Sequence, residues 1–271
     1  MIDVHTHLHP PRLFAAIRRW FRERTPWALE HETEPAAVAA ALRAAGVERF
    51  VFCSYAHKTG MARELNAWLA QTSRDLDGYG LPLATVHLDD PDPLGDCEAA
   101  FADGCIGLKI HEDVQRLTVD DPRFAPVYDA IVRHHGFVLA HIGPIPWDDD
   151  TNDGPGRVAA VLERHPELRF VVAHFGVPDS ARYVDAMARF ETLYLDTTMA
   201  FVRGTDIFAD ADAALVARAA GRIVFGTDYP NVPHAYGSEA AGLRALGLPK
   251  ALLEGIFSEN ARALAPALAR R

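Results

Sequence analysis

The sequence predicts a single, distorted (β/α)₈ barrel that takes up the whole chain, residues 1–271. Short apolar runs alternate with stretches rich in alanine, leucine and arginine, and eight such runs occur along the chain. The length of 271 residues is close to the usual size of one such barrel. The first apolar run leads into a histidine-rich segment. A doubly wound sheet, the alternative fold, would place a glycine-rich turn there.

The eight predicted strands are the apolar runs at 1–5, 49–54, 83–87, 106–110, 137–141, 169–174, 193–196 and 222–226. Most of them are almost continuously apolar, which is typical of parallel strands buried on both faces. The stretches between them, such as 34–45, 153–165 and 178–190, have helical character. Repeated βα units favour a parallel sheet, and eight of them favour closure into a barrel.

Residues 10–34 form a long insertion after the first predicted strand. Its residues Leu13, Phe14, Ile17, Trp20 and Phe21 recur at helical spacing, so we expect a helix packed across the barrel. Because the insertion follows the C-terminal end of a strand, it is also a candidate lid over the site. A second long connection, at 144–156, is rich in aspartate and is expected to be a solvated acidic loop.

Charge and composition restrict the classes of partner. The chain has 37 acidic and 27 basic residues, which gives a formal net charge of −10. Such a chain does not attract polyanions through its overall field. We therefore expect no nucleic-acid partner, and a phosphoesterase or nuclease of the TatD type is disfavoured. No apolar run approaches membrane-spanning length, so we also expect no membrane partner.

Cysteine usage and the first residues indicate the compartment. The three cysteines are odd in number and lack CxxC spacing, so a disulfide framework is not expected. We expect Cys53 and Cys105 to be inert core residues. The sequence opens with a strand-like run, and no basic segment or apolar signal segment precedes it. These features predict a cytoplasmic protein.

The placement of the histidines is the strongest functional signal in the sequence. Of the 13 histidines, several lie at or just after the ends of predicted strands, namely His5, His7, His87, His111, His141 and His174. His57 and His234 lie in loops soon after the second and eighth strands. The C-terminal ends of all strands in a barrel meet at one face, where active sites lie. Histidines that are far apart in sequence are therefore expected to converge there.

His5 and His7 form a chelating pair on the first strand. Residues i and i+2 of a strand point to the same face and stand roughly 6.6 Å apart. Two imidazoles at that spacing can reach one cation that lies about 2.1 Å from each nitrogen. Asp228 follows the eighth run, which neighbours the first strand in a closed barrel; its alternative role is to cap the following turn. Together with the further strand-end histidines, among them His141 and His174, these residues predict a site for a divalent cation.

Six motifs in order along nearly the whole chain carry a family resemblance. They are Ile2-Asp3-Val4-His5-Thr6-His7, Gly107-Leu108-Lys109-Ile110-His111, Ala140-His141-Ile142-Gly143, Ala173-His174-Phe175-Gly176, Phe225-Gly226-Thr227-Asp228-Tyr229-Pro230 and Glu259-Asn260-Ala261. As a set they resemble the amidohydrolase superfamily. The resemblance is to its amidohydrolase-2 branch, which includes the aminocarboxymuconate-semialdehyde decarboxylase-like proteins.

The resemblance implies a distorted barrel with a divalent metal ion, usually zinc. It implies ligands at His5, His7, His141 and Asp228, and His174 as a catalytic histidine near the ion. In some branches of the superfamily a carboxylated lysine ends the fourth strand and bridges two ions. Lys109 lies at that position, and in the two-ion arrangement His141 and His174 would bind the second ion.

One ion is the commoner arrangement in the branch resembled here, so we predict one ion and an unmodified Lys109. Lys109 then binds a substrate carboxylate as a point charge, or it simply pairs with Glu112 or Asp113. We predict Lys109, His111 and His57 as the substrate-binding residues.

The predicted ligand set leads to a metal-dependent hydrolase. Three neutral imidazoles and one carboxylate leave the cation a net positive charge and room for a water, whose pKa falls to about 7. Asp228 would accept the proton of that water, and His174 would orient the water or stabilise the developing oxyanion. We predict hydrolysis of an amide, ester or lactone bond in a small molecule.

Two other functions stay open at this stage. The same site would serve a metal-dependent decarboxylase of a small aromatic or unsaturated carboxylic acid. A non-catalytic metal-binding protein is the alternative from another class, but a closed structural zinc site has no role for further ionisable groups around it. The expected partner is a small-molecule substrate, and a homodimer is compatible with the sequence.

Overall fold

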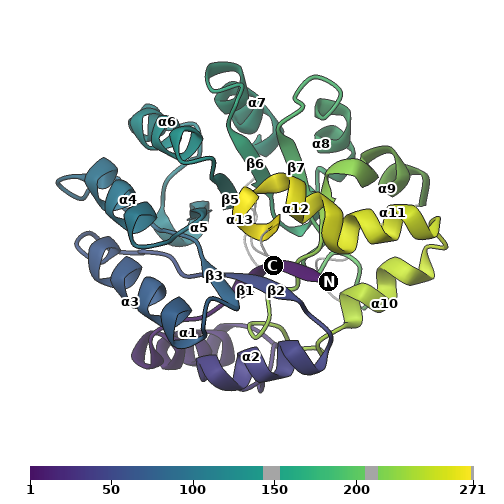
Figure 1. Cartoon of the computed structure of the whole chain (residues 1–271), viewed down its shortest axis with the longest axis horizontal. Helices are drawn as coiled ribbons and strands as arrows, with labels where there is room; N and C mark the ends of the chain where they lie inside the picture. The colour runs from purple at the N-terminus through teal and green to yellow at the C-terminus, as the bar shows by residue number, and fades with distance from the viewer. Residues whose placement is uncertain (143–152, 205–212, 270–271) are drawn as a thin grey trace.

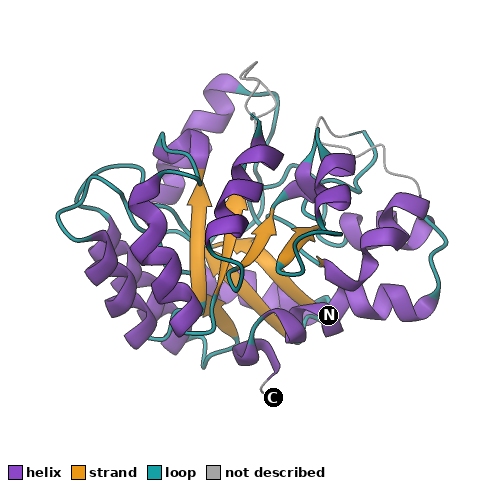
Figure 2. Ribbon diagram, turned by 90° about the horizontal axis from the view of Figure 1, so that it is seen from above, coloured by secondary structure: helices purple, strands orange, loops and turns teal. Residues whose placement is uncertain are grey.

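Eight parallel strands within the described residues form the centre of the structure, and helices surround them (Figures 1 and 2). The structure is a computed structural model that describes residues 1–142, 153–204 and 213–269. The strands are β1 (Ile2–His7), β2 (Arg49–Cys53), β3 (Gly80–Pro82), β4 (Gly107–His111), β5 (Phe137–His141), β6 (Arg169–Val172), β7 (Leu193–Asp196) and β8 (Ile223–Val224). Gly143 and most of the acidic loop predicted at 144–156 lie outside the described residues.

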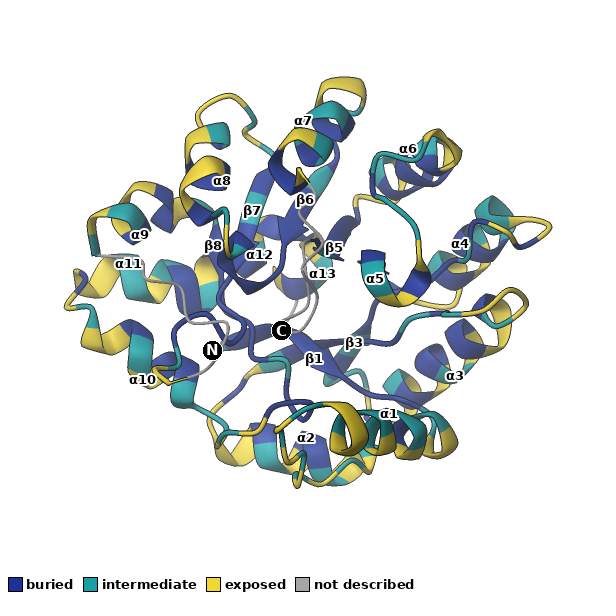
Figure 3. Cartoon of the chain, turned by 180° about the vertical axis from the view of Figure 1, so that it is seen from behind, coloured by how far each residue is buried: buried dark blue, intermediate teal, exposed yellow. Residues whose placement is uncertain are grey.

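Most of the helices connect successive strands on the outside of the barrel, and the last four follow the eighth strand. They are α1 (Pro11–Arg24), α2 (Pro35–Ala44), α3 (Ala62–Asp75), α4 (Pro93–Ala102), α5 (Glu112–Gln115), α6 (Ala125–Arg133), α7 (Gly154–Arg164), α8 (Ser180–Ala186), α9 (Ala213–Ala219), α10 (Ser238–Ala245), α11 (Lys250–Glu254), α12 (Asn260–Leu264) and α13 (Pro266–Ala269). Figure 3 shows that the strands are buried, whereas exposed residues follow the outer faces of the helices. None of the described helices is both long and apolar enough to cross a membrane.

The strands form two hydrogen-bonded sheets, ordered β1-β2-β3 and β4-β5-β6-β7-β8. Single bridges join the two sheets on both sides, from Ala84 to Leu108 and from Thr6 to Tyr229. Around the second bridge, the amide of Val4 also donates to the carbonyl of Phe225 at 2.8 Å. The predicted barrel is therefore confirmed as closed, and it is distorted because two of its eight junctions are reduced to isolated bridges.

The third strand is the one predicted strand that the structure places differently. The sequence predicts 83–87, whereas β3 is Gly80–Pro82. The side chain of Asn66 takes the place of a neighbouring strand, because it bonds both the amide and the carbonyl of Thr85 at 2.8 and 2.9 Å. Gln115 Nε2 likewise donates a hydrogen bond to the carbonyl oxygen of Val86 at 2.8 Å. These side chains satisfy the backbone of 85–86 outside the sheet.

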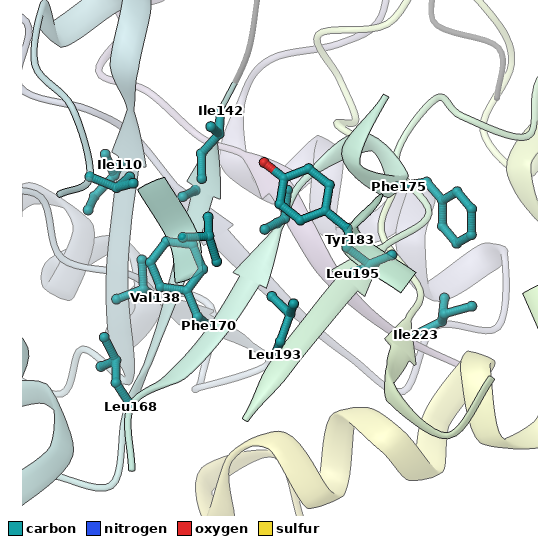
Figure 4. Packing of buried hydrophobic residues seen from close by; sticks show 14 of the residues in the cluster. Ile110, Val138, Ile142, Leu168, Phe170, Phe175, Tyr183, Leu193, Leu195 and Ile223 are labelled. Atoms are coloured by element: carbon teal, nitrogen blue, oxygen red, sulfur yellow. The ribbon is translucent and has the colours of Figure 1, made fainter. Parts of the chain in front are cut away.

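Both faces of the strands are buried, as the continuous apolar runs predict. Along β5, Phe137 and Leu139 pack inside the barrel in one cluster. Val138 and Ala140 pack in a second cluster against the surrounding helices, part of which Figure 4 shows. Ala261, Leu264 and Leu268 of the last two helices join the inner cluster. They close the end of the barrel at which the strands begin, so the opposite end holds the site.

The insertion at 10–34 contains the expected helix, α1. Phe14 is its fully buried residue, while Leu13, Ile17, Trp20 and Phe21 are half-buried. The helix therefore buries one of these residues fully and four partly, and its packing across the barrel stays a prediction. A role as a lid stays a prediction.

Candidate metal centre

The predicted chelating residues of β1 meet Asp228 at the C-terminal end of the barrel. Asp228 Oδ1 lies 2.7 Å from His7 Nε2 and 3.1 Å from His5 Nε2. The two imidazoles have ring centroids 5.2 Å apart, which agrees with their i, i+2 spacing on one strand face. Lys109 Nζ lies 2.9 Å from His5 Nε2, and its side chain is buried. Three of the four predicted ligands therefore come together, with Lys109 beside them.

His141, the fourth predicted ligand, reaches this group through His174. The Nδ1 atom of His141 lies 2.9 Å from His174 Nε2, and the ring of His174 lies 5.8 Å from the ring of His5. Within the described ranges, no hydrogen bond joins His141 directly to His5, His7 or Asp228. His174 thus stands between the two parts of the site, and its Nδ1 lies 3.2 Å from the carbonyl oxygen of Thr198.

The backbone of two site residues adopts an uncommon conformation. Asp228 has a φ of 64° and His174 a φ of 57°, both in the left-handed region that L-residues rarely occupy. Such conformations cost free energy and persist where the surrounding structure enforces them, often at functional sites. They occur in the segments that follow β6, which ends at Val172, and β8, which ends at Val224.

Burial and charge determine the protonation states of the centre. Burial raises the pKa of Asp228, but the imidazoles of His7 and His5 outweigh this effect and hold that pKa well below its usual value. Burial, reinforced by Lys109, lowers the pKa of His5 to about 4. Burial likewise lowers the pKa of His141 and that of His174. The carboxylate is therefore ionised and these three imidazoles are neutral at pH 7, as metal ligands must be.

His7 differs from the other imidazoles. Burial lowers its pKa, but Cys53 and the carboxylate of Asp228 outweigh burial and raise the pKa above its usual value. A cation that binds at His7 Nε2 would therefore displace a proton from this imidazole, which makes its binding dependent on pH.

Two buried residues contact the Nδ1 atoms of the chelating pair, His5 and His7. The sequence analysis assigned neither of them a role in the site. Asp196 Oδ2 lies 2.7 Å from His5 Nδ1. Cys53, expected to be an inert core residue, lies with its Sγ 3.5 Å from His7 Nδ1. In each imidazole the partner lies on the ring nitrogen that points away from Asp228. Cys53 is consequently a neighbour of the ligand His7, not itself a ligand to an ion held at Nε2.

His111 lies beside the centre but does not complete it. Its ring stacks on His141 with centroids 4.0 Å apart and planes inclined by 9°, because the two residues are paired in register on β4 and β5. His111, Asp113 and His141 have ligand atoms within 4.8 Å of one another. Stacked parallel rings direct their in-plane lone pairs alongside each other rather than toward one point, so this trio is poorly arranged for an ion.

One polar atom of His111 nevertheless stays without a partner among the described residues. Its Nδ1 is buried and has no hydrogen-bond partner among the described residues. The ring of Tyr55 lies 5.2 Å away, and it also contacts the rings of His7 and His9. His57, by contrast, has Tyr55, Lys58 and His87 as its interaction partners. The structure therefore places His111 beside the centre, whereas within the described residues His57 makes no hydrogen bond or ring contact with the predicted ligands.

The donor set fits a divalent transition-metal ion. Two imidazole Nε2 atoms and one ionised carboxylate are the ligand types that zinc prefers. The outer nitrogens of both imidazoles already have partners, which is the usual arrangement around a metal-binding histidine. The ammonium of Lys109 shows that a positive charge is accommodated at His5 Nε2.

Comparison with known families shows to which family the chain belongs. The family model described as amidohydrolase matches residues 2–266. The chain belongs to the amidohydrolase family. It is accordingly a metal-dependent enzyme, and the resemblance noted in the sequence motifs is confirmed. No curated protein matches the amidohydrolase chain by sequence.

Solved structures show the same barrel over the full length of this amidohydrolase. An uncharacterised TIM-barrel protein from Bordetella bronchiseptica is 21% identical, with 100% of both chains covered and a TM-score of 0.73. The 5-carboxyvanillate decarboxylase LigW from Sphingomonas paucimobilis is 17% identical, with 98% of both chains covered and a TM-score of 0.68. A probable 2-pyrone-4,6-dicarboxylic acid hydrolase from Acinetobacter baumannii is 13% identical, with 97% of this chain and 98% of that chain covered and a TM-score of 0.66. At these identities the likeness shows the fold.

Proposed function

We propose that this amidohydrolase hydrolyses an amide, ester or lactone bond of a small molecule with one divalent ion, zinc by preference. The observation that carries the proposal is the position of Asp228, whose Oδ1 lies within hydrogen-bonding reach of both His5 Nε2 and His7 Nε2. One carboxylate oxygen is thus aimed at the point that both imidazoles face. An ionised carboxylate there can serve as a ligand and as a base.

His5, His7 and Asp228 would hold the ion, with His141 as the fourth ligand. When bound, a divalent ion supplies Lewis-acid polarisation of a carbonyl group and acidifies a water molecule. Asp228 would accept a proton from the attacking water and return it to the leaving group. Because its carboxylate is ionised, it is ready to act as this base at neutral pH.

His174 is proposed to position the attacking water; to stabilise a developing oxyanion, its Nε2 would have to carry a proton. A neutral His174 that donates Nδ1–H to the carbonyl of Thr198 keeps a lone pair on Nε2. His141 Nδ1–H can donate to that lone pair in the resting site. A water that replaces this contact would donate to an acceptor held in place by the backbone at Thr198.

Lys109, His111 and His57 are proposed to bind the substrate. The buried ammonium of Lys109 is a point charge suited to a carboxylate. The unpartnered Nδ1 of His111 offers a further hydrogen bond to a polar group of the substrate. The net charge of −10 favours a small molecule over a polyanion.

Decarboxylation of a small carboxylic acid is the second candidate reaction. The specific observation in its favour is again Lys109, because a buried cation beside the centre would hold a carboxylate close to His5. Among the similar structures, three are named decarboxylases and one a probable hydrolase, at identities of 13–18%. The names thus lend decarboxylation more support than hydrolysis, whereas the geometry at Asp228 is the ground for proposing hydrolysis first.

Zinc-loaded protein tested on a panel of lactones, esters, amides and aromatic acids distinguishes the two reactions. Release of acid or amine supports hydrolysis, and release of carbon dioxide supports decarboxylation and overturns the proposal. Elemental analysis should give one ion per chain. Two ions, or a carboxylated Lys109, would make His174 a metal ligand instead.

The roles at the centre are tested by Asp228→Asn with His5→Ala as its matched control. Asparagine keeps an oxygen near the ion but cannot accept a proton at neutral pH. We expect Asp228→Asn to retain part of its zinc and to lose about 10²-fold or more in kcat. His5→Ala should lose zinc and activity together. A zinc-loaded Asp228→Asn variant with wild-type kcat would assign the proton transfer to another group.

A further inference from the structure

Asp196, the last residue of β7, connects two site residues that the proposed function treats separately. Its carboxylate is fully buried. Oδ2 lies 2.7 Å from His5 Nδ1, while Oδ1 accepts the backbone N–H of His174 at 2.8 Å and that of Thr198 at 3.0 Å. Both oxygens are therefore used, one for the predicted metal ligand and one for the segment that carries the predicted catalytic histidine.

The contact with His5 determines which ring nitrogen of that imidazole is protonated. A carboxylate only accepts hydrogen bonds, so the neutral imidazole must place its proton on Nδ1 to bond with Asp196. Thr198 Oγ1, which lies 3.1 Å from the same Nδ1, can accept from that proton as well. His5 Nε2 then carries a lone pair, and this is the nitrogen that faces Asp228 and Lys109. A metal ion needs that lone pair.

The contact with His174 acts on the backbone rather than on the ring. His174 has a φ of 57°, a conformation that the surrounding structure has to enforce. Asp196 Oδ1 binds the amide of this same residue, and it also binds the amide of Thr198, whose carbonyl lies next to His174 Nδ1. The carboxylate thus holds both the residue and the backbone that its side chain contacts.

We propose that Asp196 is the positioning residue of this centre, which fixes the tautomer of His5 for metal binding and the backbone of His174 for catalysis. The proposal rests on the function assigned to His5 and His174 above. Asp196 itself touches neither the ion nor the substrate, and it acts through these two histidines.

The substitution Asp196→Asn tests the tautomer without removing the backbone contacts. Its amide oxygen would stay toward the N–H groups of His174 and Thr198, since an NH₂ group there would face two donors. The NH₂ group must then face His5 Nδ1, which becomes an acceptor and moves the ring proton to Nε2. We expect the affinity for zinc, measured by competition with a chromophoric chelator, to fall about 10-fold to 100-fold.

The matched control is Asp3→Asn, since Asp3 is another fully buried aspartate and lies on β1, the strand of His5. Asp3 Oδ1 accepts the backbone N–H of His5, and Oδ2 accepts from Thr227 and Tyr236, so it does not touch the imidazole ring. We expect the zinc affinity of this control to stay within about twofold of wild type. Equal losses in Asp3→Asn and Asp196→Asn would reduce Asp196 to a general structural role and overturn the proposal.

A direct readout of the tautomer keeps the test independent of folding and of turnover. Long-range ¹H–¹⁵N correlation spectra of the metal-free wild type should show His5 with its proton on Nδ1, the signal being assigned by its loss in His5→Gln. In Asp196→Asn the proton should move to Nε2. A wild-type His5 protonated on Nε2 would overturn the proposal even if the variant does not fold. Because no substrate is used, failure of the proposed hydrolysis would leave this result unchanged.

Discussion

Gly226 lies where even one additional methyl group would disturb the candidate metal centre. A Cβ atom built on Gly226 would lie 2.8 Å from the Cβ of His5 and 2.7 Å from Thr198 Oγ1. The Cβ of His5 is attached directly to the β1 backbone, so it cannot move away by a change of rotamer. The substitution Gly226→Ala must therefore shift a strand that carries a predicted ligand.

The size of that shift follows from ordinary contact distances. Carbon atoms in contact lie about 3.5–4.0 Å apart, so a separation of 2.8 Å must grow by about 0.7 Å or more. A functional constellation has to be held within about 0.5 Å of its productive geometry. Overpacking of a core typically costs about 1–3 kcal/mol. We expect Gly226→Ala to lose stability in that range and to bind zinc at least about tenfold more weakly.

Gly221 supplies the matched control for this substitution. It precedes β8, is exposed, and a Cβ built on it would meet nothing within 4 Å. Gly221→Ala should leave zinc affinity unchanged and alter stability by no more than about 1 kcal/mol. The assays are urea unfolding of the metal-free proteins and zinc titration of the folded ones. If Gly226→Ala matches Gly221→Ala in both assays, the inferred contact between Gly226 and His5 is wrong.

Two further predictions concern stability. Burial raises the pKa of Glu112 from 4.5 to about 7, so the folded state favours its protonated form and stability falls as pH rises from about 4.5 to about 7. The fall in the free energy of unfolding amounts to about 3 kcal/mol at about 1.4 kcal/mol per pKa unit. Urea unfolding from pH 4 to 8 should show this fall in wild type but not in Glu112→Gln. Parallel pH profiles of the two proteins would refute the prediction. Asn260 Nδ2 donates to the carbonyls of Ala220 and Ile223 at 2.7 and 2.6 Å. Asn260→Ala leaves both without this donor, which should cost about 1–3 kcal/mol in urea unfolding; a loss below about 0.5 kcal/mol would contradict this.

Much of the fold and part of the site can be predicted from local sequence patterns, namely the apolar runs and the residues that follow them. The continuous apolar runs indicate buried parallel strands, and a barrel brings the ends of those strands together. This reasoning is sufficient to bring His5, His7 and Asp228 together, because β1 and β8 are neighbours whatever the details of packing. It does not settle where His141 points, since the orientation of its ring depends on the contacts with His111 and His174.

The sequence analysis missed two kinds of feature. One is a side chain that hydrogen-bonds a strand's backbone in place of a neighbouring strand, and the other is a side chain that contacts the outer ring nitrogen of a predicted ligand. The third strand is displaced because Asn66, distant in sequence, bonds the backbone of Thr85. Asp196 was overlooked although a usable signal exists. It is a carboxylate that directly ends an apolar strand, which is the placement that identified Asp228. Cys53 gave no such signal, because a cysteine inside an apolar run is indistinguishable from a core residue.

The seam between β8 and β1 joins the two ends of the chain through the residues that would bind the metal. Both Thr227 and Asp228 donate their amides to the carbonyl of His5, and the side chain of Asp228 reaches His7 across 221 positions of sequence. The contacts of Asp228 with His5 and His7 consequently require both β1 and the segment after β8. An ion bound to His5, His7 and Asp228 would cross-link β1 to the segment after β8. Separation of these two parts of the barrel would then require release of the ion.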